Sequence, residues 1–279
     1  MAQQGNVSWR INGLGEADLG ALLRGTLWRP PVTARRPLVE IPGRHGVISG
    51  QRPTFDAPTL PLVVEHRYKS ADLIEAAVNR LVRLLAQPAL TLSRVITTPG
   101  GVETVTSAPA DLVAVDWGDF RAWSSGTATI MLSIPGVFLR GPVTASTAAN
   151  LGTSTTLTLA NLAGSTAPIG DAIIRIKGGL TNPSVADANS GSGISWSGTL
   201  ATTDYLYLDA RTLTARRSTS ATAWTSGGTD VTSTLSYPVG GPLQLWPDVN
   251  GAVTVQIAGS APSASPIPTI SVQAGGAYL

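Results

Sequence analysis

The sequence has no cysteine among its 279 residues and only two histidines. Without cysteine there is no disulfide framework, no thiolate metal site and no cysteine nucleophile. The histidines are His45 and His66, and neither has the HxxxH or HExxH spacing that brings two ligands to one metal ion. We therefore expect no metal site, and no motif in the chain calls for a cofactor.

Signatures of catalysis are also scarce. The chain has no GxSxG nucleophile elbow and no glycine-lysine phosphate loop. Asp116 and Asp119 flank Trp117-Gly118 and invite comparison with the paired carboxylates of a glycosidase. The favoured alternative is a turn whose aspartates accept hydrogen bonds from nearby backbone N–H groups. Asp204 and Asp209 stand at the ends of a predicted strand and are ordinary there. The sequence predicts a protein that is not an enzyme.

Long apolar runs are missing as well. No window contains eighteen consecutive apolar residues, and residues 1–20 lack the apolar stretch of a signal peptide. The net charge is only +2, and Arg35-Arg36 and Arg216-Arg217 are pairs rather than patches. Membrane insertion is not expected, and the charge is weak evidence for nucleic-acid binding.

Charge is unevenly distributed along the chain. Residues 1–140 contain fourteen Lys+Arg and eleven Asp+Glu, whereas residues 141–279 contain five and six. The second part is rich in Thr, Ser, Gly and Ala. This shift predicts a boundary between two domains near residue 140. In the second part, apolar residues alternate between turn signals, which favours a sandwich of short strands over a disordered chain.

One helix is predicted, over about residues 70–87. Ser70 is placed to cap its first turn, Asp72 lies where the helix dipole favours an anion, and Pro88 ends it. Its apolar face consists of Leu73, Ile74, Ala77, Val78, Leu81, Val82, Leu84 and Leu85. Such a helix covers the face of a sheet, and a membrane-binding or partner-binding helix is the alternative.

The remaining pattern is that of β-strands. Residues 60–68 form a predicted strand before the helix, and residues 89–107 a predicted hairpin with glycines at its turn. Near the end of the chain, Asn250-Gly251 predicts a hairpin between strands at 242–248 and 252–259. The expected fold class is mainly β. A β-sandwich or split-barrel domain with one helix, residues 1–140, precedes a β-sandwich domain, residues 141–279.

Two stretches are candidate sites. Gly43, Arg44, His45 and Gly46 place two cationic or titratable side chains on a predicted tight turn between extended runs. The tryptophans of the second half are Trp196, Trp224 and Trp246, which either stack on sugar rings or fill the sandwich core. Trp196 is the candidate for stacking, because flanking glycines would leave its ring uncovered.

The order of these pieces carries a resemblance. INGLGEADLG, IPGRHG, GQRPTFDAPTLPLVVEHR, one helix and a hairpin resemble the first domain of the distal tail protein (Dit) family of siphophages. The second half is similar to the galectin-like, jelly-roll sandwich of that family, through APIGDAIIRIKGGLTNPSV, GISWSG and TTDYLYLDARTLTARR. The resemblance covers about residues 7 to 275. Family members often have an acidic residue after the glycine-arginine pair, where this sequence has His45.

The resemblance implies a structural virion protein of a long, non-contractile tail. The first domain would form a ring with copies of itself, typically a hexamer, at the distal end of the tail tube. Implied partners are the major tail tube protein and the tail-tip hub or baseplate proteins, together with tape-measure and receptor-binding proteins. DNA would pass transiently through the lumen, and assembly would take place in the cytoplasm of the bacterial host.

Within such a ring, the resemblance places the turn near a contact between subunits. Gly43 and Gly46 would give it backbone freedom, and Arg44 would offer a forked donor to a carboxylate on a neighbour. The alternative function is that of a carbohydrate-binding or carbohydrate-cleaving β-sandwich protein, in which Trp196 would be the stacking platform.

Overall fold

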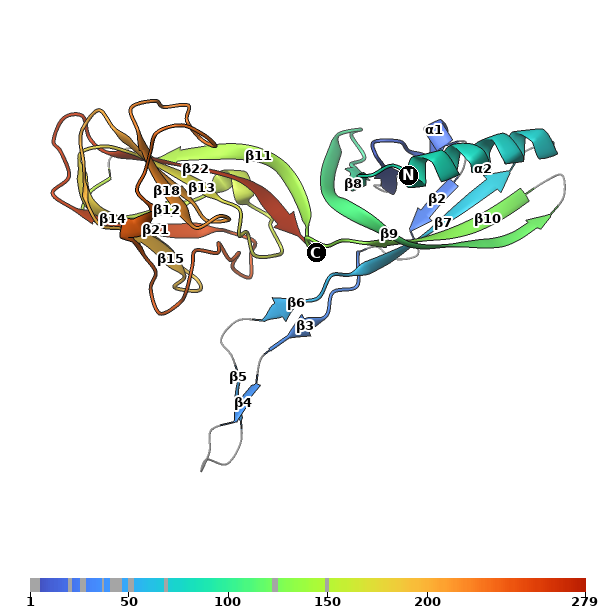
Figure 1. The fold of residues 1–279 in the computed structure, drawn as a ribbon, viewed down its shortest axis with the longest axis horizontal. Coiled ribbons are helices and arrows are strands. Elements are labelled where there is room, and N and C mark those ends of the chain that lie inside the picture. Colours follow the sequence, from blue (N-terminus) through green and yellow to red (C-terminus); the bar gives the residue numbers. More distant parts are fainter. Residues whose placement is uncertain are drawn as a thin grey trace. The chain divides into compact units, whose positions relative to one another are not determined.

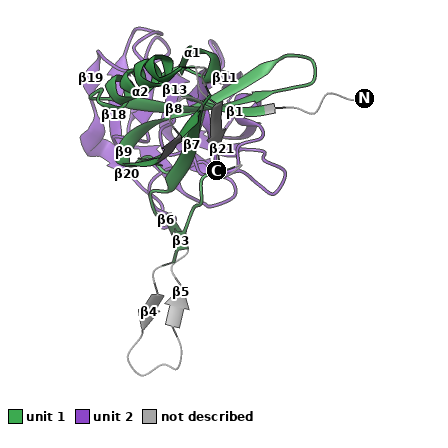
Figure 2. Cartoon of the chain, turned by 90° about the vertical axis from the view of Figure 1, so that its right-hand side faces the viewer, with its two compact units in different colours: residues 1–140, 279 green, residues 141–278 purple. Residues whose placement is uncertain are grey.

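The computed structural model describes residues 6–19, 22–25, 29–36, 38–40, 47–49, 53–67, 70–121, 125–148 and 151–279. The chain divides into two compact units, residues 1–140 together with Leu279 and residues 141–278 (Figure 2). Both units consist mainly of antiparallel strands (Figure 1), which confirms the predicted fold class.

One strand of the first unit belongs to two sheets. Strand β9 (Glu103–Arg121) pairs up to Ala110 with β8 (Leu90–Thr97), which in turn pairs with β1 (Asn6–Ile11). From Asp111 onward β9 pairs with β10. The second sheet has the order β2-β7-β10-β9, with β2 at Leu22–Gly25, β7 at Thr59–Arg67 and β10 at Ser125–Ser133.

The predicted helix is present as α2 (Ala71–Leu85), and a short helix, α1 (Glu16–Leu19), precedes it. Helix α2 packs on β7 (Figure 1) and buries Ile74, Ala77, Leu81, Leu84 and Leu85. The predicted apolar face is wider than the face that the sheet covers, because Leu73 and Val82 are 53% and 45% exposed. The predicted cap is wrong: Ser70 makes no side-chain capping bond, and its carbonyl accepts a hydrogen bond from the Ile74 N–H at 3.4 Å.

The predicted hairpin at 89–107 is confirmed by the pairing of β8 with the first part of β9. The register runs from Leu90 opposite Ala110 to Thr97 opposite Glu103. At the turn, the Thr98 N–H donates to the Val102 carbonyl at 2.9 Å. Gly101 has a φ of +79°, a left-handed conformation that glycine adopts without steric cost.

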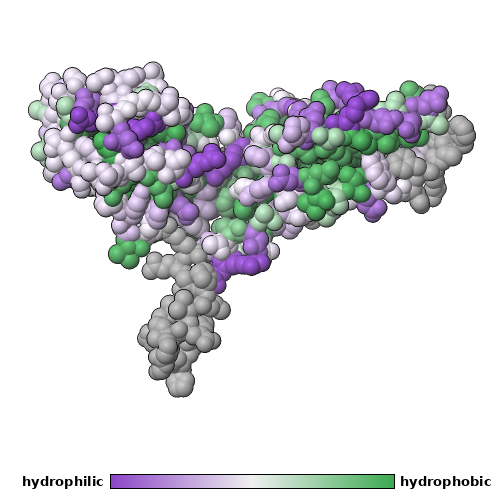
Figure 3. All heavy atoms as spheres, in the orientation of Figure 1, coloured by the Kyte–Doolittle hydropathy of each residue, from purple (hydrophilic) through white to green (hydrophobic). Residues whose placement is uncertain are grey.

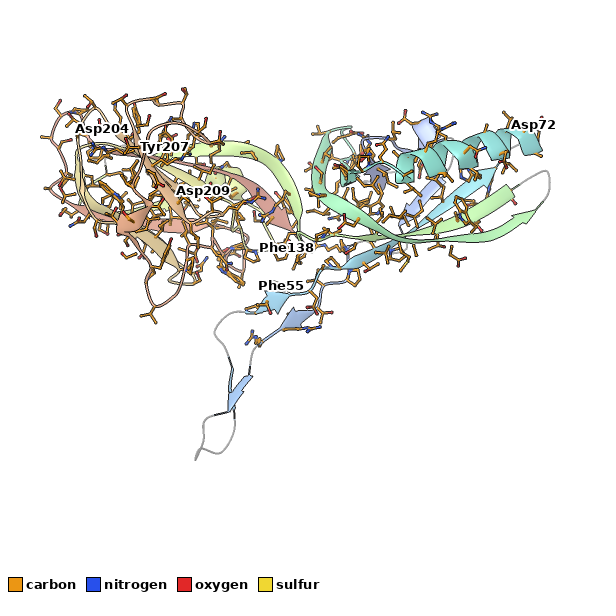
Figure 4. The ribbon with its side chains drawn as sticks, viewed as in Figure 1. Phe55, Asp72, Phe138, Asp204, Tyr207 and Asp209 are labelled. Carbon is orange, nitrogen blue, oxygen red and sulfur yellow. The ribbon has the colours of Figure 1, made fainter. Side chains whose placement is uncertain are left out.

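Between β2 and β7 the chain forms two short two-stranded ladders. Strand β3 (Ala34–Arg35) pairs with β6 (Thr54–Phe55), and β4 (Leu38–Glu40) pairs with β5 (Val47–Ser49). We call the described residues between 34 and 56, which form these two ladders, the hairpin arm (Figure 1). Its β6 strand is held to the first unit by an edge-to-face contact of Phe55 with Phe138, with ring centroids 5.4 Å apart (Figure 4).

The second unit contains two antiparallel sheets, as expected for a β-sandwich. The first has the order β19-β18-β17-β13-β22-β11 and the second β12-β21-β14-β15-β20, with β16 paired to β14. The strands of the first sheet are β11 (Leu139–Ala148), β13 (Ile173–Lys177), β17 (Tyr205–Asp209), β18 (Thr214–Ser218), β19 (Thr229–Asp230) and β22 (Thr269–Tyr278). Those of the second are β12 (Ser154–Thr158), β14 (Leu180–Asp187), β15 (Gly193–Trp196), β16 (Thr199–Leu200), β20 (Leu235–Ser236) and β21 (Thr254–Ser260). Two 3-10 helices are η1 (Ala160–Leu162) and η2 (Thr232–Thr234).

One expectation for the second unit needs correction, and one strand was not predicted. Residues 242–248 do not form a strand: they contribute two isolated bridges, Ile169 antiparallel to Leu245 and Gly193 parallel to Pro242. Asn250-Gly251 therefore turns the chain without joining two strands of a hairpin. Conversely, β14 runs through Asn182-Pro183, a dipeptide that usually ends a strand. The strand continues because its register shifts there, with Asn182 at a φ of +48°.

Candidate assembly surface

The first unit leaves part of one sheet face uncovered. Residues directly opposite each other on β10 and β9 share a face, so their exposures can be compared pair by pair. Leu132 is fully buried, whereas its partner Leu112 is 39% exposed. Ala128 is 1% exposed, whereas its partner Trp117 is 41% exposed. The face is therefore buried along β10 and open along β9.

We call the β9 side of this face, with Leu112, Val115 and Trp117, the open face. Val113, at the register shift between β9 and β10, is 58% exposed and adds to the apolar surface of this strand. Figure 3 shows hydrophobic residues gathered beneath α2 in the first unit. Apolar residues left exposed together in this way mark interaction surfaces in soluble proteins.

The same part of β9 is an edge of the sheet. On the side opposite β10, residues 111–121 have no partner strand in the described part of the chain, whereas residues 103–110 are paired there with β8. An edge of this kind presents a row of unpaired N–H and C=O groups and is a template for another strand. This surface was not predicted from the sequence, although the sequence pattern of β9 indicates it. Residues 112–117 carry apolar side chains at both even and odd positions, which a strand with one solvent face does not need.

At the base of the hairpin arm, residues 34–36 and Thr54 are exposed, and Pro53, Phe55 and Asp56 are half-buried. Arg35 donates from Nε to Asp56 Oδ2 at 2.7 Å, and the two side chains are 73% and 41% exposed. Each ladder of the arm has two strands in the described part of the chain, with no third strand beside them. A two-stranded ribbon of this kind is marginally stable in water without a third strand or a packed face.

The predicted turn lies between the paired strands β4 and β5. The register places Glu40 opposite Val47, so the extended runs on either side of the motif are joined as a hairpin. Gly43, Arg44, His45 and Gly46 themselves lie outside the described residues. Their role in assembly stays a prediction.

The expectation that the Trp196 ring is uncovered is wrong. The side chain is 5% exposed, and its six-membered ring occupies the space beside Gly198, where an added Cβ would lie 2.4 Å from the ring. The neighbouring glycine does not bare the ring but makes room for it. Trp196 is a core residue of the second unit, and it offers no platform for a sugar.

The second unit does gather aromatic and cationic side chains on the outer side of β13 and β17. The Arg175 guanidinium lies 4.7 Å from the Trp224 ring centroid and donates to the Ala221 carbonyl and to Ser271 Oγ. The Tyr207 hydroxyl donates to the Ser220 carbonyl at 2.6 Å. These contacts hold the segment from Ser220 to Trp224 over the sheet, so that Tyr207 is 1% exposed.

The carboxylates considered as candidates are dispersed. Asp116 is exposed on β9, and Asp119 lies three residues further along the same strand rather than in a turn. Asp204 and Asp209 lie at either end of β17 (Figure 4). The first pairs with Arg217 at 3.4 Å, and the second accepts hydrogen bonds from the N–H groups of the following turn. These arrangements are those of ordinary structural carboxylates.

Other kinds of site find little support. Within the described ranges, no group of three or more His, Asp or Glu residues is arranged to hold a metal ion. None of the helices in these ranges has the length and apolar character needed to cross a membrane.

Comparison with known proteins identifies the fold. No family model matches the sequence, and the search of curated proteins finds no match. Among solved structures, the chain is similar to the SPP1 Dit protein, described as a paradigm of the hub adsorption apparatus in phages that infect Gram-positive bacteria. The TM-score is 0.59 at 12% identity, over 97% of this chain and 99% of that one.

Two structures of the phage P2 baseplate in its activated conformation, with calcium and with strontium, are also similar. Their TM-scores are 0.41 and 0.42 at 11% identity, over 98% of this chain and 100% of each of those chains. The similarity to SPP1 Dit confirms the resemblance to the distal tail family at the level of the fold, across both units.

Proposed function

We propose that this chain is a structural protein of a phage tail tip, a hub protein of the distal tail type. The observation that carries the proposal is the shared fold with SPP1 Dit over 97% of the chain. The open face and free edge of β9 support it, because a subunit of a larger assembly needs surface that its own fold does not cover.

In this proposal, copies of the first unit form a ring, a hexamer, at the distal end of the tail tube. The ring joins the tube to the tail-tip or baseplate proteins and leaves a passage for DNA. The second unit contributes no chemistry: its described carboxylates are dispersed, and general acid–base catalysis needs positioned groups with tuned pKa values. The alternative function, carbohydrate binding, was based on an exposed Trp196 ring, but this side chain is buried.

The test is direct observation of the purified full-length chain. Negative-stain electron microscopy should show rings with a central hole, and light scattering should give a mass that is a multiple of 28.7 kDa. A monomer at concentrations up to about 100 μM, well above the dissociation constants of stable assemblies, would contradict the proposal.

A further inference from the structure

The chain contains two Asn-Gly dipeptides, Asn12-Gly13 and Asn250-Gly251, and both lie at turns. A glycine after asparagine favours deamidation, because no side chain hinders the approach of its backbone nitrogen to the asparagine side chain. We infer that Asn250 deamidates spontaneously in the folded protein, that Asn12 is protected by its hydrogen bonds, and that Asp248 sets the rate at Asn250. This inference is independent of the proposed function.

The reaction needs only the chain itself and water. The backbone nitrogen of Gly251 attacks Cγ of Asn250 and closes a succinimide ring. The side-chain nitrogen of Asn250 leaves with the proton of that backbone nitrogen, as ammonia. Water then opens the ring at either of its carbonyl groups and leaves aspartate or isoaspartate at position 250. In isoaspartate the main chain runs through the former side chain, so the backbone is longer by a methylene group.

At the first dipeptide, the asparagine side chain is held at both of its polar atoms. Asn12 Nδ2 donates to Gln87 Oε1 at 2.5 Å, and Asn12 Oδ1 accepts from the Thr91 N–H at 2.6 Å. The Asn12 N–H also donates to the Thr91 carbonyl at 2.8 Å. Gln87 follows α2 and Thr91 belongs to β8. Asn12 Cγ therefore cannot turn toward the Gly13 nitrogen without breaking contacts to other elements of the first unit.

At the second dipeptide, the contacts of the asparagine are local. Asn250 is exposed, and its N–H donates to Asp248 Oδ1 at 2.8 Å. The polar group beside its side chain is the same carboxylate. The pKa of Asp248 is lowered by hydrogen bonds, most strongly from the Ala252 N–H and also from the backbone and side chain of Asn250. These contacts all lie within residues 248–252, and an exposed turn opens locally at low cost.

Asp248 restrains the nitrogen that would attack. Its carbonyl accepts a hydrogen bond from the Gly251 N–H at 3.0 Å, and its Oδ1 accepts one from the Ala252 N–H at 2.8 Å. The Gly251 nitrogen can reach Asn250 Cγ only when this turn opens. The Asp248 carboxylate stabilises the closed turn, so it slows the reaction without preventing it.

The product would disturb the packing of the turn. The Gly251 carbonyl accepts a hydrogen bond from the Gly164 N–H at 3.0 Å, and a Cβ added to Gly251 would lie 3.0 Å from Gly164 Cα. This close approach leaves little room for a longer backbone. The new carboxylate at position 250 would also lie near that of Asp248, and like charges repel. Deamidation should therefore lower the temperature at which the protein unfolds.

Mass spectrometry of the full-length protein tests the inference. Trypsin separates the two sites, because its peptides 11–24 and 218–279 contain Asn12 and Asn250 as their only asparagines. The folded protein is incubated at mildly alkaline pH and digested at intervals. Peptide 218–279 should gain the mass of an amide-to-acid conversion at least about tenfold faster than peptide 11–24. An isoaspartyl methyltransferase should label peptide 218–279, and the unfolding temperature should fall as this peptide is converted.

The unfolded chain is the matched control. Ile11 and Val249, both β-branched, precede the two asparagines, so in concentrated urea the two sites should react at similar rates. A difference between the sites in the folded protein then comes from the fold. Asn250→Gln should abolish the conversion of peptide 218–279 and leave that of peptide 11–24 unchanged.

A second variant tests the role of the carboxylate. Asp248→Ala should speed deamidation of Asn250 in the folded protein about tenfold, because it removes two hydrogen bonds that close the turn. In urea this variant should react like the parent. Circular dichroism checks that the variant folds, and the comparison of the two sites in the parent chain does not depend on it.

Each outcome either supports or overturns the inference. Faster conversion at Asn250 than at Asn12 in the folded protein, with similar rates in urea, supports it. No conversion at Asn250 in the folded protein, or conversion at Asn12 that is as fast or faster, overturns it. An unchanged rate in folded Asp248→Ala overturns the role of Asp248, and an unchanged unfolding temperature overturns the expected disturbance of the turn. The tail-tip proposal stands or falls separately, by the observation of rings.

Discussion

At the scale of single residues, burial determines the pKa of Tyr207 and makes Trp196 part of the core. Tyr207 is enclosed by the segment that it helps to hold, and burial raises the pKa of its phenol above the ordinary value of 10.0. The nearby Arg175 acts in the opposite direction and lowers this pKa, but burial is the larger effect. Tyr207 therefore stays protonated, and its hydroxyl remains a donor to the Ser220 carbonyl.

This shift predicts a loss of stability at alkaline pH. Because the folded-state pKa lies above the unfolded-state value, the contribution of Tyr207 is complete below about pH 10 and is lost as pH rises beyond it. Tyr207→Phe should lower the free energy of unfolding by about 1 kcal/mol at neutral pH and flatten its decline above pH 10. Urea unfolding of the parent and the variant across this range measures both effects. Tyr237→Phe, at a ring that is 38% exposed, is the control. Identical alkaline profiles for parent and Tyr207→Phe would contradict the prediction.

A second residue-scale prediction concerns Trp196. Trp196→Ala should lower the free energy of unfolding by about 3–5 kcal/mol, because it empties a large buried volume. Trp196→Phe should cost less, since the indole Nε1 makes no hydrogen bond to the described residues and none is lost. Chemical denaturation checks both values. An alanine variant as stable as the parent would show that the ring is not part of the core.

The Trp196 expectation also shows what residue-level reasoning cannot supply. The sequence correctly placed this tryptophan on a short strand between glycines, as β15 confirms. Glycines next to a ring can either expose it or let it lie against the backbone, and the sequence does not distinguish the two. The choice depends on the partner strands β14 and β20, which complete the sheet on either side of β15.

At the scale of elements, long periodic segments were predictable and irregular ones were not. The helix at 70–87 and the hairpin at 89–107 have strong local signals, and both are present. Strand β14 was hidden by its Asn-Pro pair. There the Asn182 N–H donates to the Gly198 carbonyl at 2.8 Å, and Asn182 Oδ1 accepts from the Gly198 N–H at 2.9 Å. These contacts join residues that are distant in the sequence, so no local sequence pattern predicts them.

The open face leads to a prediction at this scale, with a control on the opposite strand. Leu132 and Leu112 lie directly opposite each other, one fully buried and the other 39% exposed. Leu132→Ala should lower the free energy of unfolding by about 2–5 kcal/mol, whereas Leu112→Ala should lower it by about 1 kcal/mol or less. Leu112→Ala should nevertheless raise the concentration needed for ring assembly, because it removes apolar surface that only a partner covers.

Denaturation of the monomer and light scattering of the assembly separate these two effects. Equal losses of folding stability for Leu112→Ala and Leu132→Ala would mean that both leucines belong to the core of the first unit. Unchanged assembly of Leu112→Ala would mean that the open face is not an interface.

At the scale of the whole molecule, the order of weak motifs carried more information than any single motif. The pieces from INGLGEADLG to TTDYLYLDARTLTARR pointed to a distal tail fold, and the similarity to SPP1 Dit over 97% of the chain confirms that fold. Assembly surfaces were less predictable, because they are defined by what the fold leaves uncovered. Exposure of Leu112 and Trp117 can be judged only once α2 and β10 are in place.

The exchange of the backbone amides of β9 with deuterated solvent should report whether the protein is assembled. In an antiparallel pair, alternate residues direct their amides toward the partner strand and away from it. Beyond Ala110, the amides of β9 that point away from β10 have no protein strand to protect them in the described chain. In deuterated solvent they should exchange rapidly in the dilute subunit, while their neighbours exchange slowly. In the ring both sets should exchange slowly, so mass spectrometry of a peptide spanning residues 111–121 would report occupancy of this one edge while the rest of the sheet serves as its internal reference.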